Sequence, residues 1–164
     1  MDACNYPRAG FGYDSHVFED GRRLVLCGVE VPGCAGLKAH SDGDAPIHAL
    51  IDALLGAAAL GDIGSHFPDK DERWRGADSK QLLASTVGLL RDAGWRPWNA
   101  DVTIVCEKPK IAPFAAAMRE SLASVLNIDP SSVSVKGKTN EGMDAVGAGR
   151  GLAAYAAVSI APIS

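Results

Sequence analysis

The segment from residue 44 to residue 61 carries the clearest structural pattern in the chain. Five apolar residues recur there at helical spacing and form one continuous face. They are Ile47, Leu50, Ile51, Leu54 and Leu55. Asp44 is suited to cap this helix, and Pro46 lies in its first turn, where a missing N–H costs nothing. We therefore predict an amphipathic helix that ends at Gly61 and packs its apolar face on the rest of the core.

The other segments with regular patterns read as strands and helices. Strands are predicted over residues 8–18, 23–31, 99–106, 133–138 and 152–160, and helices over 78–93 and 113–126. The resulting order, β-β-α-α-β-α-β-β, is typical of an α+β protein. With 164 residues and no low-complexity linker, the chain is expected to form a single domain over residues 1–164. We predict a mixed four- to five-stranded sheet with three helices packed on one face.

Composition and charge argue against several classes of protein. Apolar residues make up 47% of the chain and charged residues 22%, which is ordinary for a globular protein. The net charge of -4 argues against nucleic acid or an anionic membrane as the main partner. The apolar run over residues 151–163 is too short to span a bilayer. We expect no signal peptide, because residues 1–7 lack a basic region followed by an apolar stretch.

The cysteines do not form a recognisable metal or disulfide framework. They are Cys4, Cys27, Cys34 and Cys106, and none belongs to a C-x-x-C pair. Four cysteines in a chain of this length are too few for a disulfide-dense scaffold. We interpret them as reduced thiols and expect a cytoplasmic location.

All four histidines lie in the first 66 residues, each with an aspartate within four positions. Asp14 and His16 are two residues apart on a predicted strand, so both side chains project from one face. His48 lies in the predicted helix, and Asp52, one turn further on, could orient its ring. Asp14, His16 and His48 would give two nitrogens, one oxygen and an open fourth position, which is the catalytic zinc arrangement. Taken singly, each of these residues also fits an ordinary structural role.

Two polar loops carry further candidates. Residues 40–44 lead into the predicted helix, whose N-terminus favours phosphate, and His40 and Ser41 could add donors. Residues 62–69 could bind sugar hydroxyls through aspartate and pack Phe67 on an apolar edge of a ligand. The alternatives are a capped helix start for the first loop and a surface loop with an anchoring aromatic for the second.

A late turn over residues 136–142 supplies cations, a hydroxyl and one carboxylate. It could contact phosphate and hold a divalent metal ion on Glu141, or it is a charged hairpin tip; the P-loop spacing is absent. The sequence has no G-x-S-x-G elbow and no Cys beside a His. If the chain is an enzyme, the attacking group is therefore expected to come from the substrate, which fits phosphoryl transfer.

Together these motifs resemble the cyclodiphosphate synthases of the non-mevalonate isoprenoid pathway, and the resemblance runs from residue 8 to about residue 158. The matching blocks are RAGFGYDSHVF (8–18), GLKAHSDGD (36–44), HA (48–49), DALLG (52–56), DIG (62–64), HFPD (66–69), GADS (76–79), DVTI (101–104), PK (109–110) and KTNEG (138–142). The resemblance implies an α+β domain that assembles as a homotrimer, with active sites between adjacent subunits.

The resemblance also implies a reaction and its metals. The substrate would be a small nucleotide, 4-diphosphocytidyl-2-C-methyl-D-erythritol 2-phosphate, whose 2-phosphate attacks its own β-phosphorus and expels CMP. Zn²⁺ would lie on Asp14, His16 and His48, with its open position polarising a β-phosphate oxygen. Glu141 would hold a second divalent cation, Mg²⁺ or Mn²⁺, that bridges the α- and β-phosphates.

Other matching positions would carry catalytic and binding roles. His40 and Thr139 would stabilise the charge on the pentacoordinate phosphorus. The binding positions would be Ser41 for phosphate, Asp62 and Gly64 for ribose, Phe67, Asp69 and Asp71 for methylerythritol, and Cys106, Pro109, Lys110, Ile111 and Ala112 for cytosine, the last group from the neighbouring subunit. Lys138 and Asn140, on either side of Thr139, would also contact the substrate.

One departure from the family and two rival functions remain. Many relatives read Gly-Arg-Gly-Glu-Gly where this chain has Ala148 and Arg150 between glycines, so the arginine is displaced and the acid is missing. In the family that arginine faces a central channel that can hold an isoprenoid diphosphate, a property that this chain therefore does not inherit by resemblance.

The rivals are a zinc-dependent phosphohydrolase and a non-catalytic trimeric module that binds nucleotides or isoprenoid phosphates. The full set of candidate ligands, with Glu141, favours the synthase.

Overall fold

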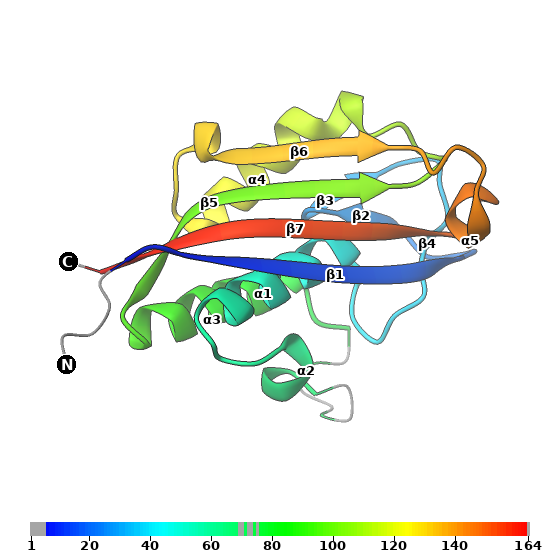
Figure 1. The fold of residues 1–164 in the computed structure, drawn as a ribbon. Helices are drawn as coiled ribbons and strands as arrows, with labels where there is room; N and C mark the ends of the chain where they lie inside the picture. Colours follow the sequence, from blue (N-terminus) through cyan, green and yellow to red (C-terminus); the bar gives the residue numbers. More distant parts are fainter. Residues whose placement is uncertain (1–5, 69–70, 72–73, 75, 164) are drawn as a thin grey trace.

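The computed structural model describes residues 6–68, 71, 74 and 76–163, and a five-stranded sheet forms its centre (Figure 1). The strands are β1 (Arg8–Glu19), β4 (Gly36–Leu37), β5 (Trp95–Val105), β6 (Val133–Lys138) and β7 (Gly151–Pro162). They lie in the order β4-β1-β7-β5-β6. β5 and β6 are parallel, whereas the other neighbours are antiparallel. The predicted mixed sheet of an α+β domain is confirmed, with five strands.

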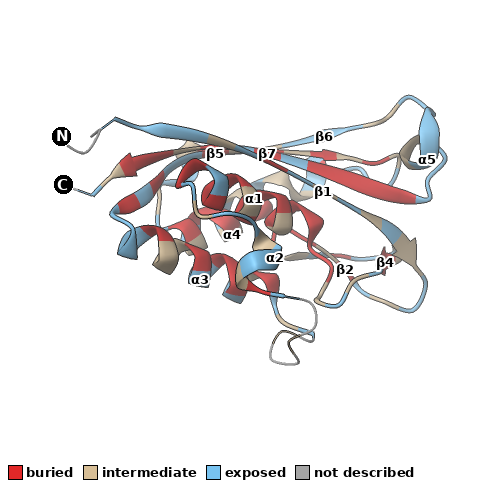
Figure 2. Ribbon diagram, turned by 60° about the horizontal axis from the view of Figure 1, so that its bottom comes forward, coloured by how far each residue is buried: buried red, intermediate tan, exposed pale blue. Residues whose placement is uncertain are grey.

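Three longer helices lie on one face of this sheet (Figure 2). They are α1 (Ala45–Ala57), α3 (Ser79–Asp92) and α4 (Ala115–Leu126). The described residues also form two four-residue helices, α2 (Ile63–His66) and α5 (Asp144–Gly147), so there are five helices rather than the predicted three. A single helical turn is too short to show an apolar period, which is why the sequence pattern did not separate these two from loops.

Two predicted strands differ from the observed ones. Residues 23–31 form not one strand but a hairpin of β2 (Leu24–Leu26) and β3 (Val29–Val31), a separate two-stranded sheet. The chain turns between them at Cys27 and Gly28, which have positive φ angles of 53° and 73°. β5 begins four residues earlier than predicted, because it continues through Pro97 with an irregularity in its pairing to β7. Pro97 is accommodated where the ladder is already interrupted.

The helix α1 confirms the predicted amphipathic helix and its buried apolar face. The five residues of its predicted apolar face are at most 1% exposed. Asp44 caps the helix, because its Oδ1 accepts a hydrogen bond from Ile47 N at 3.1 Å. The helix ends at Ala57 rather than at Gly61, since Ala59 adopts a positive φ of 58° and turns the chain away.

The strand β1 approaches α1 closely enough to exclude side chains between them. A Cβ added at Gly12 would lie 1.9 Å from Ala49 O, and one added at Gly10 would lie 1.9 Å from Ala53 O. Only glycine permits such an approach of two backbones. The contact sets the middle of β1 beside the first turns of α1, where the candidate site lies.

The face of the sheet opposite the helices is not covered by any element of the described chain (Figure 2). Phe11, Tyr13 and Tyr155 are 67%, 50% and 37% exposed on it. The rings of Tyr13 and Tyr155, paired across β1 and β7, have centroids 5.1 Å apart. Large exposed apolar patches are characteristic of interaction surfaces.

The apolar run near the C-terminus is the strand β7, which pairs with β1 on one side and β5 on the other. Among the helices of the described residues, none has the length and hydropathy required to cross a membrane.

Candidate active site

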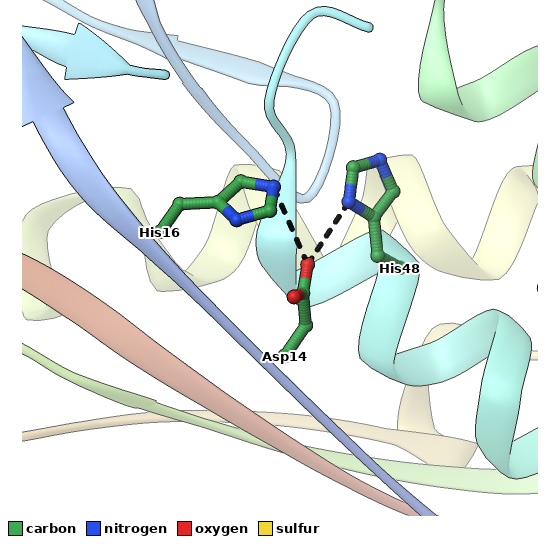
Figure 3. A group of neighbouring side chains, drawn as sticks. All are labelled: Asp14, His16 and His48. Carbon is green, nitrogen blue, oxygen red and sulfur yellow. Dashed lines mark hydrogen bonds and ion pairs between the residues drawn. The ribbon is translucent and has the colours of Figure 1, made fainter. Parts of the chain in front are cut away.

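The three predicted zinc ligands lie together at the junction of β1 and α1. Asp14 and His16 project from β1 toward α1, and the ring of His48 faces them (Figure 3). His48 Nδ1 lies 3.0 Å from Asp14 Oδ2, and His16 Nε2 lies 3.5 Å from the same oxygen. One ligand atom from each residue lies within 4.8 Å of the others. The cluster thus presents two nitrogens and one oxygen toward a common point.

The environment of this cluster fits a metal ion. His16 Nε2 is buried and has no hydrogen-bond partner within the described part of the chain. A buried ring nitrogen in that state is costly, and a cation between it and Asp14 would satisfy both. Two imidazoles and one carboxylate suit Zn²⁺ better than Mg²⁺, and three protein ligands leave one position for substrate.

The local charges also favour a cation. Burial lowers the pKa of His48, but the hydrogen bond and negative charge of Asp14 act in the opposite direction. The negative charges of Asp44 and Asp42 add to this effect, and the pKa of His48 is raised above its ordinary value. An environment that stabilises an imidazolium also stabilises a bound metal ion.

The second nitrogen of His48 faces away from the cluster. His48 Nε2 lies 3.0 Å from Ser79 Oγ and 3.2 Å from Ser41 Oγ. Asp52, which we expected to orient this ring, instead accepts a hydrogen bond from Ile63 N at 2.7 Å. Ser79 was not among the predicted site residues, because it lies on another helix, 31 positions along the chain.

The cluster lies on the wall of a pocket of about 440 Å³. The pocket is lined by Asp14, His16, Lys38, Ala39, His40, Ser41, His48, Asp52, Ile63, Gly64, Phe67, Trp74 and Leu82. His40, Ser41, Gly64 and Phe67, all predicted from the sequence, therefore share a cavity with the cluster. Phe67 is buried and packs edge-on against Trp74, with ring centroids 5.1 Å apart. Sequence reasoning missed Trp74, because no periodic pattern marks it.

The remaining residues predicted around Phe67 have different positions. Asp62 is exposed and caps α2, accepting hydrogen bonds from Ser65 N at 2.9 Å and Ser65 Oγ at 2.6 Å. These bonds lower the pKa of Asp62. Asp71 is half-buried, and its N donates to Pro68 O at 2.9 Å. Asp69 lies outside the residues that the structure describes.

A second group of predicted residues forms a separate pocket of about 140 Å³ where β5 and β6 end. Its lining consists of Cys106, Pro109, Lys110, Ile111, Ala112, Gly137, Lys138 and Thr139. Cys106 N donates to Lys138 O at 2.9 Å and extends the pairing of the two strands. Burial, with smaller contributions from Cys34 and Glu107, raises the pKa of Cys106 to about 11, so its thiol stays neutral. This pocket shares no lining residue with the larger one.

The loop after β6 holds Thr139 and Glu141 side by side. Thr139 Oγ1 donates to Glu141 Oε1 at 2.6 Å. The carboxylate of Glu107 secures the loop, since its Oε1 accepts from Asn140 N at 2.9 Å and from Gly142 N at 3.3 Å. Glu107 was not predicted, although its position after β5 and before Pro109 placed it next to the predicted pocket.

The fold and the site define an α+β protein with a candidate catalytic metal centre beside a pocket. The chain belongs to the YgbB family, whose model matches residues 7–161. A curated relative from Symbiobacterium thermophilum, named 2-C-methyl-D-erythritol 2,4-cyclodiphosphate synthase, is 56% identical over 93% of this chain and 97% of its own length. With relatives so named at this identity, the chain is an enzyme of that type, a cyclising lyase.

Solved structures agree with this assignment. The bifunctional IspDF protein of Campylobacter jejuni matches 97% of this chain with a TM-score of 0.93 and 37% identity, and this chain spans 43% of that protein. A 2C-methyl-D-erythritol-2,4-cyclodiphosphate synthase in a form bound to CDP matches 93% of this chain and 99% of its own, with a TM-score of 0.86 and 40% identity.

Proposed function

We propose that this enzyme converts 4-diphosphocytidyl-2-C-methyl-D-erythritol 2-phosphate to 2-C-methyl-D-erythritol 2,4-cyclodiphosphate and CMP. An oxygen of the 2-phosphate forms a bond to the β-phosphorus. The bond from that phosphorus to the bridging oxygen breaks, and CMP leaves with the electron pair. The attack is intramolecular, so the chain has to position two phosphates rather than supply a nucleophile. The cluster of Asp14, His16 and His48 beside the larger pocket is the observation that carries this proposal.

Zinc is the ion that we propose for this cluster, held by Asp14 and His16 from β1 and by His48 from α1. When bound, Zn²⁺ supplies a Lewis acid at a β-phosphate oxygen. Glu141 is the proposed ligand of a second divalent cation, Mg²⁺ or Mn²⁺, which prefers carboxylate oxygens. Thr139 holds one oxygen of Glu141 in place through its hydroxyl.

The protein groups around the phosphates have proposed roles that follow from their chemistry. His40, exposed on the wall of the larger pocket, and the hydroxyl of Thr139 are proposed to stabilise charge on the reacting phosphorus. Ser41 Oγ accepts from Gly43 N at 3.2 Å, which leaves its own proton to donate to phosphate. Lys138 and Asn140 are proposed to contact the substrate beside Thr139.

The rest of the substrate is assigned to the flanking segments. The smaller pocket, formed by residues 106–112 together with the end of β6, is proposed to take the cytosine base. Its apolar lining at Ile111, which is 3% exposed, suits the face of a flat ring. Asp62 and Gly64 are proposed to bind the ribose, and residues 67–71 to surround the methylerythritol unit.

We further propose that the active enzyme is a homotrimer whose adjacent subunits each supply one half of the site. The substrate joins cytosine to the reacting phosphates, yet the pocket beside the metal cluster and the pocket proposed for cytosine have no lining residue in common within one chain. The uncovered aromatic face around Phe11, Tyr13 and Tyr155 offers an apolar surface for association. The free thiols of Cys27, Cys34 and Cys106 fit the cytoplasmic location that we propose.

Sedimentation velocity tests the trimer. Tyr13→Glu is expected to dissociate it, because a carboxylate would be buried in an apolar interface without a partner. Tyr6→Glu is the matched control, since Tyr6 is 73% exposed and precedes β1. A wild-type protein that sediments as a monomer at all concentrations would refute the trimer and leave the metal cluster unaffected.

Phosphorus NMR of the turnover reaction tests the chemistry. Wild type with Zn²⁺ and Mg²⁺ is expected to yield the cyclic diphosphate and CMP, and a folded His48→Ala protein is expected to yield neither. Inorganic phosphate without cyclisation would identify a zinc-dependent phosphohydrolase instead. No turnover by a folded, zinc-loaded wild type would point to a non-catalytic module that binds nucleotides or isoprenoid phosphates.

A further inference from the structure

A buried hydroxyl lies behind the ring of His48, on the side opposite the metal cluster. Among the described residues, only Asp44, Ser79 and Thr86 are polar and fully buried. Asp44 caps α1, and Thr86 Oγ1 donates to Leu82 O within its own helix. Ser79, the first residue of α3, is 0% exposed, and its Oγ lies 3.0 Å from His48 Nε2. The contacts of Ser79 therefore concern the site rather than its own helix.

The hydrogen bonds of Asp42 determine the direction of the bonds that follow. An ionised carboxylate can only accept. Asp42 Oδ2 accepts from Ser79 N at 3.0 Å, and Asp42 Oδ1 accepts from Ser79 Oγ in a short hydrogen bond. The one proton of the Ser79 hydroxyl is thereby committed to Asp42. Only lone pairs of Ser79 Oγ remain for His48 Nε2, which lies 3.0 Å away.

The proton between Ser79 and His48 must therefore be on the ring. His48 Nε2 donates to Ser79 Oγ, and a neutral ring with its proton on Nε2 has a free lone pair on Nδ1. Nδ1 is the atom that faces Asp14 Oδ2 at 3.0 Å. A lone pair and a carboxylate oxygen at this distance repel each other unless a proton or a metal ion lies between them. The tautomer that Ser79 imposes at Nε2 is thus the one that leaves Nδ1 free to bind a metal ion.

We propose that Asp42 and Ser79 are positioning residues that hold the proton on His48 Nε2 and keep Nδ1 as the metal-binding atom. The inference rests on the zinc site proposed above and extends it to residues that do not touch the ion. The backbone keeps Asp42 in place, because its N donates to Ala77 O at 3.2 Å while Asp44 N donates to its Oδ1 at 3.2 Å. Outer partners of this kind fix the orientation and basicity of a metal-bound histidine.

The arrangement also joins two parts of the chain that lie far apart in sequence. Gly76 N donates to His40 O at 2.9 Å, beside the contact between Asp42 and Ala77. The loop that carries His40 and Ser41 is therefore fastened to the start of α3 at several points. The ring of His48 rests against this junction and cannot rotate without breaking its bond to Ser79.

Zinc affinity of the full-length chain, measured by competition with a chromophoric chelator, tests the proposal without relying on activity. Ser79→Ala is expected to raise the zinc Kd about 10- to 100-fold, the usual effect of removing a partner of a metal-bound histidine. Ser85→Ala is the matched control, because Ser85 lies on the same helix, is exposed and donates only to Gln81 O at 2.9 Å. Its zinc Kd is expected to equal that of wild type.

A second variant tests the hydrogen bonds between Ser79 and Asp42 with little change in packing. Asp42→Asn keeps the size of the side chain but replaces one acceptor oxygen by a donor, so it cannot accept from both Ser79 N and Ser79 Oγ. The zinc Kd is expected to rise as it does in Ser79→Ala. Nitrogen-15 NMR of the zinc-loaded wild type is expected to show a protonated Nε2 and a metal-bound Nδ1 on His48, a readout that needs no substitution.

The outcomes distinguish the positioning role of Asp42 and Ser79 from the zinc site on which it rests. A wild type that binds no zinc overturns both the metal site and the positioning role of Asp42 and Ser79. A wild type that binds zinc, with Ser79→Ala and Asp42→Asn binding it equally well, overturns the positioning role alone. Zinc bound through Nε2 of His48 in the wild-type spectrum would overturn the positioning role in the same way.

Discussion

The substitution Gly12→Ala would test how the fold brings the metal ligands together. The added methyl would lie 1.9 Å from Ala49 O, 2.8 Å from Ala53 N and 3.0 Å from Ala49 C. All three atoms belong to the backbone of α1, so no side-chain rotation can relieve the clash. The helix and β1 would have to separate, and His48 is the residue that directly precedes Ala49.

The size of the effect follows from the distances. Carbon and oxygen need at least about 3.0 Å between them, so β1 and α1 must move apart by about 1.1 Å. Zinc ligands tolerate deviations of only about 0.2 Å. A shift of this size would detach His48 from Asp14 and His16. We expect the zinc Kd to rise by more than about 100-fold, above the range for losing an outer partner, and stability to fall by about 3 kcal/mol, the upper end for overpacking.

Chelator competition and guanidinium unfolding of the zinc-free protein measure the two effects separately. Gly88→Ala is the matched control, because Gly88 lies within α3 and a Cβ there would meet nothing within 4 Å. That change is expected to stabilise the fold by about 0.5–1 kcal/mol, since alanine favours helix. If Gly12→Ala binds zinc and unfolds as wild type does, the close contact of β1 with α1 does not position the ligands.

Three further predictions concern residues around the site. Burial raises the pKa of Asp44 to about 7 from 3.8. The contribution of Asp44 to the free energy of unfolding is therefore fully present below about pH 4, and it falls by up to about 1.4 kcal/mol per pH unit as the pH rises toward 7. Denaturation at several pH values should show this slope, and Asp44→Asn should flatten it; an equal slope in both would contradict the assignment. Glu107→Gln should speed hydrogen exchange at the amide of Asn140 and raise the Mg²⁺ concentration that half-saturates activity; an unchanged exchange rate would contradict the role of Glu107 in holding the loop. Arg22→Gln should lower kcat more than it changes KM, because the Arg22 guanidinium holds the carbonyls on both sides of His40, at 2.8 and 2.7 Å; an effect confined to KM would contradict it.

The sequence predicted those elements whose periodicity extends over several turns or residue pairs. The helix α1 was predictable because its apolar face and its Asp44 cap agree with one another. The hairpin of β2 and β3 was read as one strand, because the first of the two left-handed residues at its turn is Cys27 rather than asparagine or glycine. Turn chemistry of this kind depends on tertiary contacts: Asp44 accepts from Cys27 N at 2.8 Å and from Gly28 N at 2.6 Å.

Within the site, local spacing predicted which residues could act, but not which partners hold them. Asp14 and His16 share a strand face by their spacing alone. Asp52 has the correct helical spacing to His48, yet its carboxylate is bonded to Ile63 N. The ring is bonded instead to Ser79, and only the packing of α3 beside the loop after β4 brings this residue near. Partners of that kind come from long-range packing, which a single sequence does not encode in any local pattern.

One pattern in β1 nevertheless encodes both the packing and the chemistry of the site. Gly10, Gly12, Asp14 and His16 alternate along the strand, so all four face α1. The two glycines let the helix backbone come into contact with the strand. The next two positions on the same face then carry the side chains that reach across to His48. The order of these residues matters. Side chains at the glycine positions would keep α1 away from β1, and glycines in place of Asp14 and His16 would remove the metal ligands from the point of contact. Gly-x-Gly-x-Asp-x-His therefore specifies the distance between strand and helix together with the donors that use it.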